Sequence, residues 1–265
     1  MIYFVFLAIG LGIGSLIGGL NAEKDSLPFD DVKRFILTAI LASIVGARLF
    51  HVLFEGFLDY YLQHPTAILL PWNGGLSVWG GLIAALLAIL LVFRKQRNRL
   101  IELLDCFSPA FLFGLGVTRI GCFLQGCCYG KPTNLPWGIT YRKGSHAFLT
   151  QLDLGLIDSD ALRTLPIHPT QIYESIAAIS AGLVLQMFLR RGHDKGNIFM
   201  YGMLSYAVIR FVNEFFRADN RGFVEGIPIP QIISAFLIIS IISIKLWRRR
   251  LRTQLEQYSD IGEKP

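Results

Sequence analysis

The sequence begins with MIYFVFLAIGLGIGSLIGGL (residues 1–20), a run without a single charged side chain. A helix that crosses the hydrocarbon core of a bilayer needs about 20 mostly apolar residues. A second uncharged run of nearly that length occupies residues 226–243. The first run has no basic flank and no small-residue cleavage site followed by polar sequence, so we expect a retained transmembrane helix and not a signal peptide.

The composition of the whole chain also indicates a membrane protein. Of its 265 residues, 53% are hydrophobic and only 17% are charged, whereas soluble domains carry about 25% charged residues. The mean hydropathy is +0.50. Five further apolar segments lie near residues 35–54, 76–93, 106–124, 172–189 and 196–216. We predict an all-α, polytopic bundle of about seven transmembrane helices, and a single domain over residues 1–265, because no repeat or linker divides the chain.

Basic residues are distributed unevenly between the predicted loops. The loops after the first, third, fifth and seventh helices are rich in Lys and Arg, whereas residues 55–75 have none and residues 125–165 only four. By the positive-inside rule, the N-terminus is extracytoplasmic and the C-terminus is cytoplasmic. Three loops then form an extracytoplasmic cap: residues 55–75, 125–167 and 217–228. The concentration of basic residues in the cytoplasmic loops accounts for the net charge of +6. We therefore expect no nucleic-acid partner.

Two arginines lie inside predicted helices, where an ionised side chain is costly and marks a functional candidate. Arg119 lies near the outer end of the fourth helix, and Arg210 follows fourteen uncharged residues in the sixth. Helical spacings of four and three place Arg210, Glu214 and Arg217 on one face. A guanidinium binds phosphate through a planar fork of donors and keeps its charge. These residues suit an anionic lipid headgroup; the alternative is an Arg–Glu pair that ties helices together.

Two further segments introduce predicted helices. NGGLSVWGG (residues 73–81) contains Gly74, Gly75, Gly80 and Gly81, which allow close approach either of another helix or of a ligand. HPTQIYES (residues 168–175) clusters polar side chains where the chain enters the bilayer: His168, Gln171, Tyr173 and Glu174. Histidine could act as a base near neutral pH, and a helix-entry cap explains the same residues equally well.

Three of the four cysteines lie in CFLQGCC (residues 122–128). Three interpretations are open for Cys122, Cys127 and Cys128. A disulfide is one, because the outer side of the membrane is oxidising, and buried, inert thiols are another. The third is a metal site, but it needs more ligands than this stretch offers, and the usual Cys-x-x-Cys spacing is absent. We therefore expect no bound metal.

Four motifs, in their order along the chain, resemble one known family. They are Gly-Gly followed by Gly-Gly-Leu-Ile (residues 74–83), Arg-x-Gly-x-Phe-x-x-Gly-x-x-x-Gly (119–130), His-Pro-x-Gln-x-Tyr-Glu (168–174) and Arg-x-x-x-Glu-Phe-Phe-Arg (210–217). Tyr3 in the first helix, Gly46-Ala47-Arg48 in the second and Gln231 at the start of the seventh also fit. The chain thus resembles the bacterial prolipoprotein diacylglyceryl transferases nearly end to end.

The resemblance implies a seven-helix enzyme of the bacterial plasma (inner) membrane. Such an enzyme transfers the diacylglyceryl group of phosphatidylglycerol to the lipobox cysteine thiol of a prolipoprotein. Its partners would be phosphatidylglycerol, the lipobox peptide and the bilayer, with no metal or organic cofactor. The implied catalytic residues are Tyr3, Arg119, Arg210 and Glu214. The implied substrate-binding residues are Arg119, Gly74, Gly75, Gly80, Gly81, Gly130, His168, Gln171, Tyr173, Glu174 and Arg217.

The chain departs from the family pattern at several polar positions. Trp79 stands where the family usually has histidine, and Cys122 and Cys127 replace the usual asparagine and glutamate. Gln125 replaces a second asparagine. In the family, these polar residues are thought to bind the headgroup and to activate the thiol. Two alternatives to the standard reaction follow: a divergent relative that transfers a lipid group to another acceptor, and a non-enzymatic phospholipid-binding membrane protein.

Overall fold

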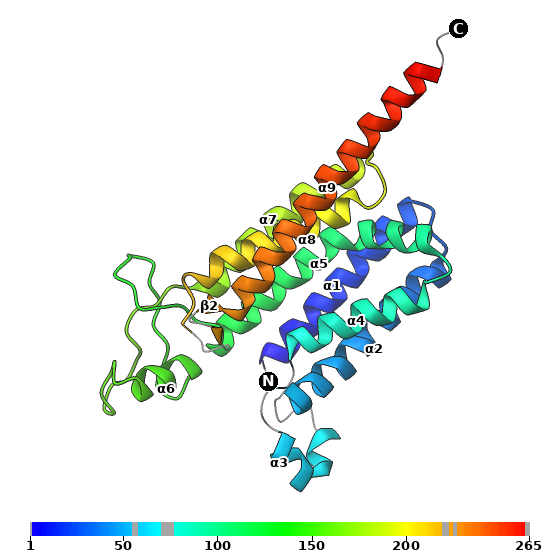
Figure 1. Cartoon of the computed structure of the whole chain (residues 1–265). Coiled ribbons are helices and arrows are strands. Elements are labelled where there is room, and N and C mark those ends of the chain that lie inside the picture. The colour runs from blue at the N-terminus through cyan, green and yellow to red at the C-terminus, as the bar shows by residue number, and fades with distance from the viewer. Residues whose placement is uncertain (1, 55–57, 70–76, 219–222, 225–226, 263–265) are drawn as a thin grey trace. The chain divides into compact units, whose positions relative to one another are not determined.

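The computed structural model describes residues 2–54, 58–69, 77–218, 223–224 and 227–262, and the regular structure in these residues is almost entirely helical (Figure 1). The elements are α1 (Ile2–Lys24), α2 (Phe29–Phe54), α3 (Leu58–Gln63), the 3-10 helix η1 (Pro65–Leu69), α4 (Val78–Val92), α5 (Arg97–Gln125), α6 (His146–Asp153), α7 (Thr170–Arg190), α8 (Asn197–Glu214), β1 (Phe223–Val224), β2 (Ile227–Pro228) and α9 (Ile229–Gly262). The two short strands pair with each other in antiparallel fashion.

Each of the seven apolar segments predicted as a span coincides with a helix. Five of these helices, α1, α2, α5, α7 and α9, have the length and composition of a membrane span within the described part of the chain. α4 is apolar but has only 15 residues, and α8, with 18 residues, contains Arg210 and Glu214. The all-α, polytopic membrane architecture is confirmed, whereas the count of seven spans and the single-domain organisation stay predictions.

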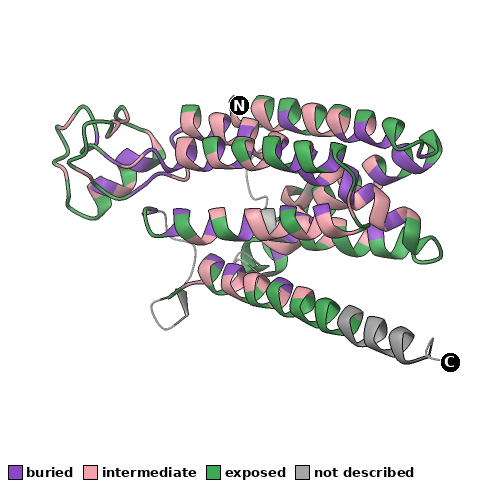
Figure 2. Cartoon of the chain, turned by 90° about the horizontal axis from the view of Figure 1, so that it is seen from above, coloured by how far each residue is buried: buried purple, intermediate pink, exposed green. Residues whose placement is uncertain are grey.

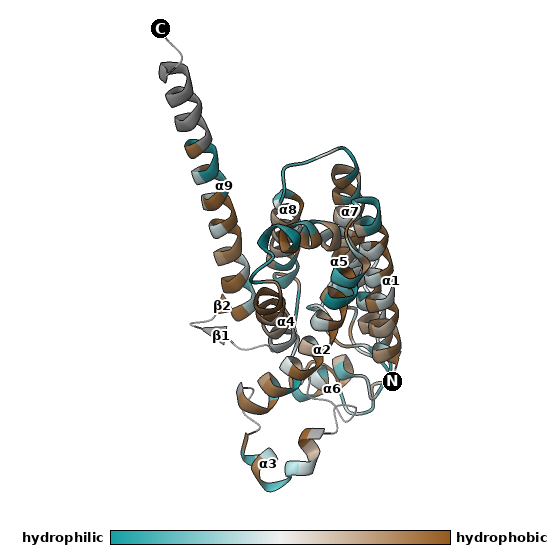
Figure 3. Ribbon diagram, turned by 90° about the vertical axis from the view of Figure 1, so that its right-hand side faces the viewer, coloured by the Kyte–Doolittle hydropathy of each residue, from teal (hydrophilic) through white to brown (hydrophobic). Residues whose placement is uncertain are grey.

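Large apolar side chains are exposed along the long helices. The exposed fraction is 63% for Leu16, 61% for Leu41 and 69% for Phe236. Figure 2 shows exposed positions recurring along the helices, and Figure 3 shows that these helices are largely hydrophobic while hydrophilic residues gather in the loops. Extensive exposed apolar surface is rare in soluble monomers. It indicates helices whose outer surface contacts lipid.

The chain divides into two compact units. Unit 1 comprises residues 1–16 and 108–265, and unit 2 comprises residues 17–107. The core of unit 2 gathers buried residues from α1, α2, α4 and α5 and from the α1–α2 and α4–α5 loops: Ala22, Leu27, Val32, Phe35, Ile89, Phe93, Leu100, Leu103 and Cys106. Asn21 Nδ2 donates a hydrogen bond to the backbone oxygen of Cys106 at 3.0 Å. This hydrogen bond pairs the side-chain amide of Asn21, a polar group that would be costly to bury without a partner.

Glycines allow α2 and α4 of unit 2 to pack closely. A Cβ atom on Gly80 would collide with Phe50. A Cβ atom on Gly81 would lie 3.1 Å from the backbone oxygen of Ser43. Small residues at such positions let membrane helices approach each other. For Gly80 and Gly81 the structure therefore supports close helix packing, which was one of the two explanations that the sequence left open.

We expect the Gly80→Ala substitution to destabilise the protein by roughly 1–3 kcal/mol, because the added methyl group overpacks the interface between α2 and α4. Gly19 is the matched control, since a Cβ atom there would meet nothing within 4 Å. Gly19→Ala should leave stability unchanged or raise it by up to about 1 kcal/mol through helix propensity. Thermal unfolding of both variants in the same detergent measures the difference. Equal melting temperatures would contradict the close packing.

Unit 1 is built around the part of α5 that follows residue 107. α1 lies against α5, where a Cβ atom on Gly10 would come within 2.5 Å of the backbone oxygen of Gly114. α7 contacts the same helix through Ser175, whose hydroxyl donates to the backbone oxygen of Gly116 at 2.8 Å. α8 in turn packs against α7 and α9. This packing brings α1, α7 and α8 close to the polar end of α5.

The long loop between α5 and α7 folds into a cap over the end of unit 1. Isolated bridges join Ile139 to Ile167 and Gly130 to Arg217. The loop contains the short helix α6, whose N-terminus is capped by Ser145 Oγ, which accepts from the backbone N–H of Phe148 at 3.2 Å. Of the three loops predicted to form an extracytoplasmic cap, this one is ordered over residues 126–169, and its composition did not indicate the short helix. Parts of the other two loops lie outside the described residues, and the extracytoplasmic side of the cap stays a prediction.

Candidate active site

A chain of ion pairs joins the helices α5, α7 and α8 and the segment that follows α8. Arg119 Nη2 lies 2.9 Å from Glu174 Oε1, and Glu174 Oε2 lies 3.7 Å from Arg217 Nη1. Glu214 Oε2 lies 4.0 Å from Arg217 Nε and 2.7 Å from Arg210 Nη2. The structure thus brings together five residues that lie on three separate segments of the sequence. We call these five residues the ionic network.

The ionic network is buried and carries more positive than negative charge. The side chain of Glu174 is 0% exposed and that of Arg210 is 3% exposed. Among the five residues of the network, three guanidinium groups face two carboxylates, so these five residues carry one more positive than negative charge. Buried charges are costly unless they are paired. The network is therefore suited to bind an anion, and a phosphate group matches the planar donors of arginine.

Asn213 belongs to this site, although the sequence analysis did not single it out. Its Nδ2 donates to Glu174 Oε2 at 3.0 Å, within the buried interior. Its Oδ1 has no hydrogen-bond partner among the described residues, so it can accept from a ligand hydroxyl. The signal in the sequence was its spacing, three residues after Arg210 and four before Arg217, which places it on the same helical face.

The polar residues at the start of α7 make two different kinds of contact. Glu174 enters the ionic network, whereas Gln171 Nε2 donates to the backbone oxygen of Cys127 at 2.7 Å. Thr170 Oγ1 donates to the backbone oxygen of Cys128 at 2.7 Å. For Gln171 the structure supports the interpretation as part of the helix entry, because its amide holds the loop that follows α5.

His168, at the end of the cap, lies beside Tyr173 in the first turn of α7. His168 Nδ1 is 3.2 Å from the Tyr173 hydroxyl, which also accepts from Trp137 Nε1 at 2.7 Å. Gly130 is required for close approach here, because a Cβ atom would lie 2.5 Å from the backbone oxygen of His168. Trp137 gave no signal in the sequence, since its contact with Tyr173 depends on how the loop folds.

Tyr141 is a further residue that the sequence analysis missed. Its hydroxyl donates to the backbone oxygen of Phe123 at 3.0 Å and receives a hydrogen bond from Gln171 Nε2 at 3.2 Å. Burial raises the pKa of Tyr141 above its usual value. The phenol therefore stays protonated and holds the cap against the end of α5.

The remaining predicted site residues lie in different places. Tyr3, in α1, packs beside Gly121 and is within electrostatic reach of Arg119 and Cys122. Gly80 and Gly81 belong to the helix packing of unit 2. Gly74 and Gly75 lie outside the described residues. The roles predicted for these residues stay predictions.

The three cysteines after Arg119 gather beside its guanidinium. Arg119 Nη1 lies 3.8 Å from Cys122 Sγ and 3.7 Å from Cys128 Sγ. The Sγ atoms of Cys122, Cys127 and Cys128 all lie within 4.8 Å of one another. All four cysteines of the chain lie in its described part, and there each is a thiol. The disulfide that the sequence allowed is not formed in this structure.

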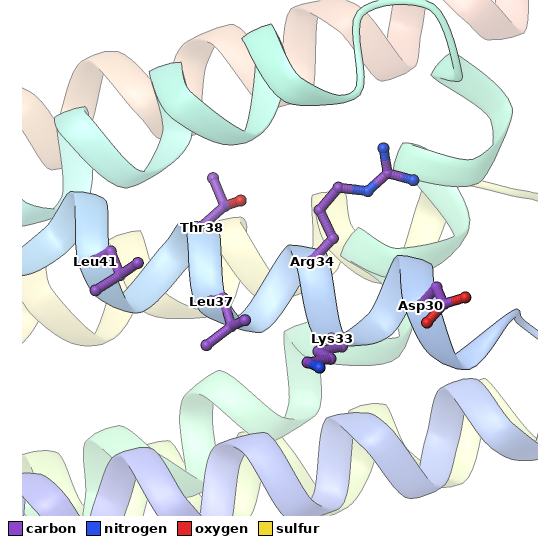
Figure 4. Close-up of a pocket in the computed structure, with 6 residues that line it drawn as sticks. All are labelled: Asp30, Lys33, Arg34, Leu37, Thr38 and Leu41. Carbon is purple, nitrogen blue, oxygen red and sulfur yellow. The ribbon is translucent and has the colours of Figure 1, made fainter.

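Unit 2 contains an open pocket with a volume of about 310 Å³, which Figure 4 shows. Its lining consists of Asp30, Lys33, Arg34, Leu37, Thr38 and Leu41. All six residues come from α2, and none was predicted as a site residue. The pocket is therefore separate from the ionic network of unit 1.

Residues 1–247 match the family model described as prolipoprotein diacylglyceryl transferase. The chain belongs to the prolipoprotein diacylglyceryl transferase family. The expected family is thereby confirmed, and the chain is a multi-pass membrane protein with apolar helices over most of its length.

Curated relatives named phosphatidylglycerol–prolipoprotein diacylglyceryl transferase match across most of their own length. The one from Finegoldia magna is 30% identical, over 91% of this chain and 88% of the relative. The one from Proteus mirabilis is 31% identical, over 94% of this chain and 87% of the relative. The one from Geobacter sulfurreducens is 35% identical, over 74% of this chain and 68% of the relative. The similarity includes both units.

Proposed function

We propose that the chain transfers the diacylglyceryl group of phosphatidylglycerol to the thiol of the lipobox cysteine in prolipoproteins, the first step of bacterial lipoprotein maturation. Membership in the family and the names of the relatives support this activity. The observation that carries the proposal is the buried ionic network, which holds Arg119 and Arg210 on different helices and keeps one positive charge in excess.

The chemistry of the reaction fits this network. A thiolate attacks a carbon of the glyceryl group, and the bond between that carbon and the phosphate oxygen breaks. Negative charge builds up on the leaving glycerol phosphate, and guanidinium groups held in place beforehand stabilise it in the transition state. Glu174 and Glu214 keep the arginines in position. Holding the lipid and the peptide side by side lowers the barrier further.

Other predicted residues have supporting roles in this proposal. Asn213 Oδ1 accepts a hydrogen bond from a hydroxyl of the glycerol headgroup, because it lacks a partner among the described residues. Tyr3 lines the site from α1. Gly130, His168, Gln171 and Tyr173 shape the cap that receives the peptide, as their contacts with one another and with the α5–α7 loop support.

The transfer reaction can be tested with the full chain in vesicles that contain phosphatidylglycerol. A lipobox peptide should gain a diacylglyceryl thioether, detected by mass spectrometry, and a peptide with serine in place of the cysteine should not. Vesicles of phosphatidylcholine alone are the lipid control. Growth of a strain depleted of its own transferase should also be restored. Turnover of phosphatidylglycerol without peptide modification would favour another acceptor, and binding without turnover would favour a non-enzymatic protein.

The proposed reaction fixes an orientation in the bacterial plasma (inner) membrane, because the lipobox cysteine is presented at the outer leaflet. We expect a reporter fused after Arg252 to be cytoplasmic, since residues 245–252 are rich in Lys and Arg. A reporter inserted near His146 should be extracytoplasmic, as should one at the N-terminus. Alkaline phosphatase and green fluorescent protein fusions measure the two sides. The reverse pattern would place the cap in the cytoplasm and contradict the proposed function.

A further inference from the structure

Three thiols converge where α5 ends and the cap begins. Cys122 is buried, Cys127 and Cys128 are half-buried, and their sulfur atoms lie within 4.8 Å of one another. Gly126, with φ of 73°, turns the chain back. This turn lets the backbone N–H of Cys127 donate to the backbone oxygen of Cys122 at 3.2 Å. The fold therefore creates a cluster of thiols that the sequence spacing does not reveal.

The backbone of this turn is held in a strained conformation. Cys128 has φ of 61°, a left-handed conformation that costs a residue with a side chain roughly 1–2 kcal/mol. Hydrogen bonds from Thr170 and Gln171 to the backbone oxygens of Cys128 and Cys127 hold the strained residues from α7. Strain of this kind persists where the surrounding structure fixes it, and it is common at functional sites. Here it directs the third sulfur toward the other two.

The surroundings of the cluster favour thiolates, the form of cysteine that binds a metal ion. Arg119 Nη1 approaches two of the sulfurs, and its positive charge stabilises thiolates. A divalent cation among the three sulfurs would replace the protons. The unit of one such cation and three thiolates has a charge of −1 and lies beside the guanidinium of Arg119.

We propose that Cys122, Cys127 and Cys128 bind one Zn²⁺ ion through three thiolates, with the fourth coordination position open beside Arg119. Zinc–sulfur bonds of about 2.3 Å in a tetrahedral arrangement require sulfur atoms about 3.8 Å apart. The sulfur atoms, all within 4.8 Å, need to approach by only about 1 Å to meet this distance. Zinc sites with three protein ligands and one open position are typical of catalysis, whereas structural sites have four protein ligands.

The open position takes a thiol, and this part of the inference rests on the proposed function. The lipobox thiol binds Zn²⁺ through sulfur and loses its proton to water, because a thiol that coordinates a metal ion is deprotonated. The thiolate then forms the sulfur–carbon bond to the glyceryl group, and the electron pair of the broken carbon–oxygen bond leaves with the phosphate. Zn²⁺ keeps its oxidation state.

The inference is tested first by metal binding to the full, reduced chain in detergent. We expect one Zn²⁺ per chain by elemental analysis, and a thiolate-to-metal charge-transfer band when Co²⁺ is used as the probe. Cys106→Ser is the matched control, because Cys106 is buried in unit 2, where its thiol contacts Asp25. This control should bind Zn²⁺ like the wild type. Cys122→Ser, Cys127→Ser or Cys128→Ser should each weaken binding by more than about tenfold, since even the partners of metal ligands contribute that much.

The Cys128→Gly variant separates metal binding from folding. Glycine adopts a positive φ without strain, so the variant should be at least as stable as the wild type in thermal unfolding, and yet it should lose the Zn²⁺. A reduced wild-type chain that binds no Zn²⁺, or a triple serine variant that binds it as well as the wild type, overturns the site. A disulfide among these cysteines with no Zn²⁺ uptake after reduction overturns it as well.

Binding of the lipobox thiol at the open coordination position is tested separately. Addition of a lipobox peptide to the Co²⁺-loaded chain should shift the absorption spectrum, and the peptide with serine should leave it unchanged. If the metal binds but no transfer occurs in phosphatidylglycerol vesicles, the proposed function fails while the metal site stands. If the Cys128→Gly variant transfers lipid at the wild-type rate without Zn²⁺, the role in thiol activation is overturned while the proposed function stands.

Discussion

Replacement of Arg119 by lysine should lower the rate of transfer by roughly 100- to 1,000-fold, even though the charge is kept. Arg119 uses one guanidinium nitrogen to pair with Glu174 at 2.9 Å and the other to approach Cys122 and Cys128. The ammonium group of lysine is a single point of charge and cannot form a planar fork of donors. Arg210→Lys should have a similar effect, because Arg210 pairs with Glu214 in the same buried network.

The measurement is the turnover number with a lipobox peptide and phosphatidylglycerol vesicles, using protein whose insertion has been checked by proteolysis. Arg163→Lys is the matched control, because Arg163 lies on the exposed part of the cap and donates to Thr140 Oγ1 at 3.1 Å. Its rate should stay within about twofold of the wild type, as is usual for surface substitutions. If Arg119→Lys or Arg210→Lys turns over at the wild-type rate, that arginine does not stabilise the transition state.

The sequence was sufficient to predict the membrane helices because hydropathy depends only on local composition. Long uncharged runs such as residues 1–20 must cross or enter an apolar phase, and each predicted span coincides with a helix. The short helix α6 was missed, since eight residues with a Ser145 cap give a weak local signal. The tight contact at Gly80 was left open because the partner, Phe50, lies about thirty residues away in the chain.

The candidate site was predictable where charge and helical spacing combine. Arg210 and Glu214 are costly in a membrane helix and share one face, so their pairing could be inferred. Asn213 lies on that face too, but asparagine is a common polar residue and only its hydrogen bond to Glu174 reveals its role. The sequence grouped the three cysteines of residues 122–128 but left a disulfide, inert thiols and a metal site open. The approach of their sulfur atoms depends on the left-handed conformation of Gly126 and Cys128.

The Glu174→Gln substitution should destabilise the protein by about 3–5 kcal/mol, because it removes one partner from a buried set of ion pairs. The carboxylate of Glu174 faces Arg119 at 2.9 Å and Arg217 at 3.7 Å, and its side chain is 0% exposed. Without it, three guanidinium groups share the single carboxylate of Glu214. The excess of buried positive charge rises from one to two.

A second substitution tests whether charge, rather than shape, causes this loss. Adding Arg217→Gln to Glu174→Gln leaves two guanidinium groups and one carboxylate, and so restores the excess to one. The double variant should therefore be more stable than the sum of the two single effects predicts, as expected for residues in direct contact. Unfolding of all three variants in the same detergent gives the coupling energy.

Glu102→Gln is the control for the loss of a carboxylate as such. Glu102 pairs with Arg99 at 3.2 Å in unit 2, where both side chains are partly exposed. Removal of this pair should cost no more than about 1 kcal/mol, because solvent screens it. A Glu174→Gln variant as stable as Glu102→Gln would show that water or lipid already compensates the buried arginines. The ionic network would then have no excess positive charge to bind a phosphate group. The binding site for the phosphate would have to lie elsewhere in the protein.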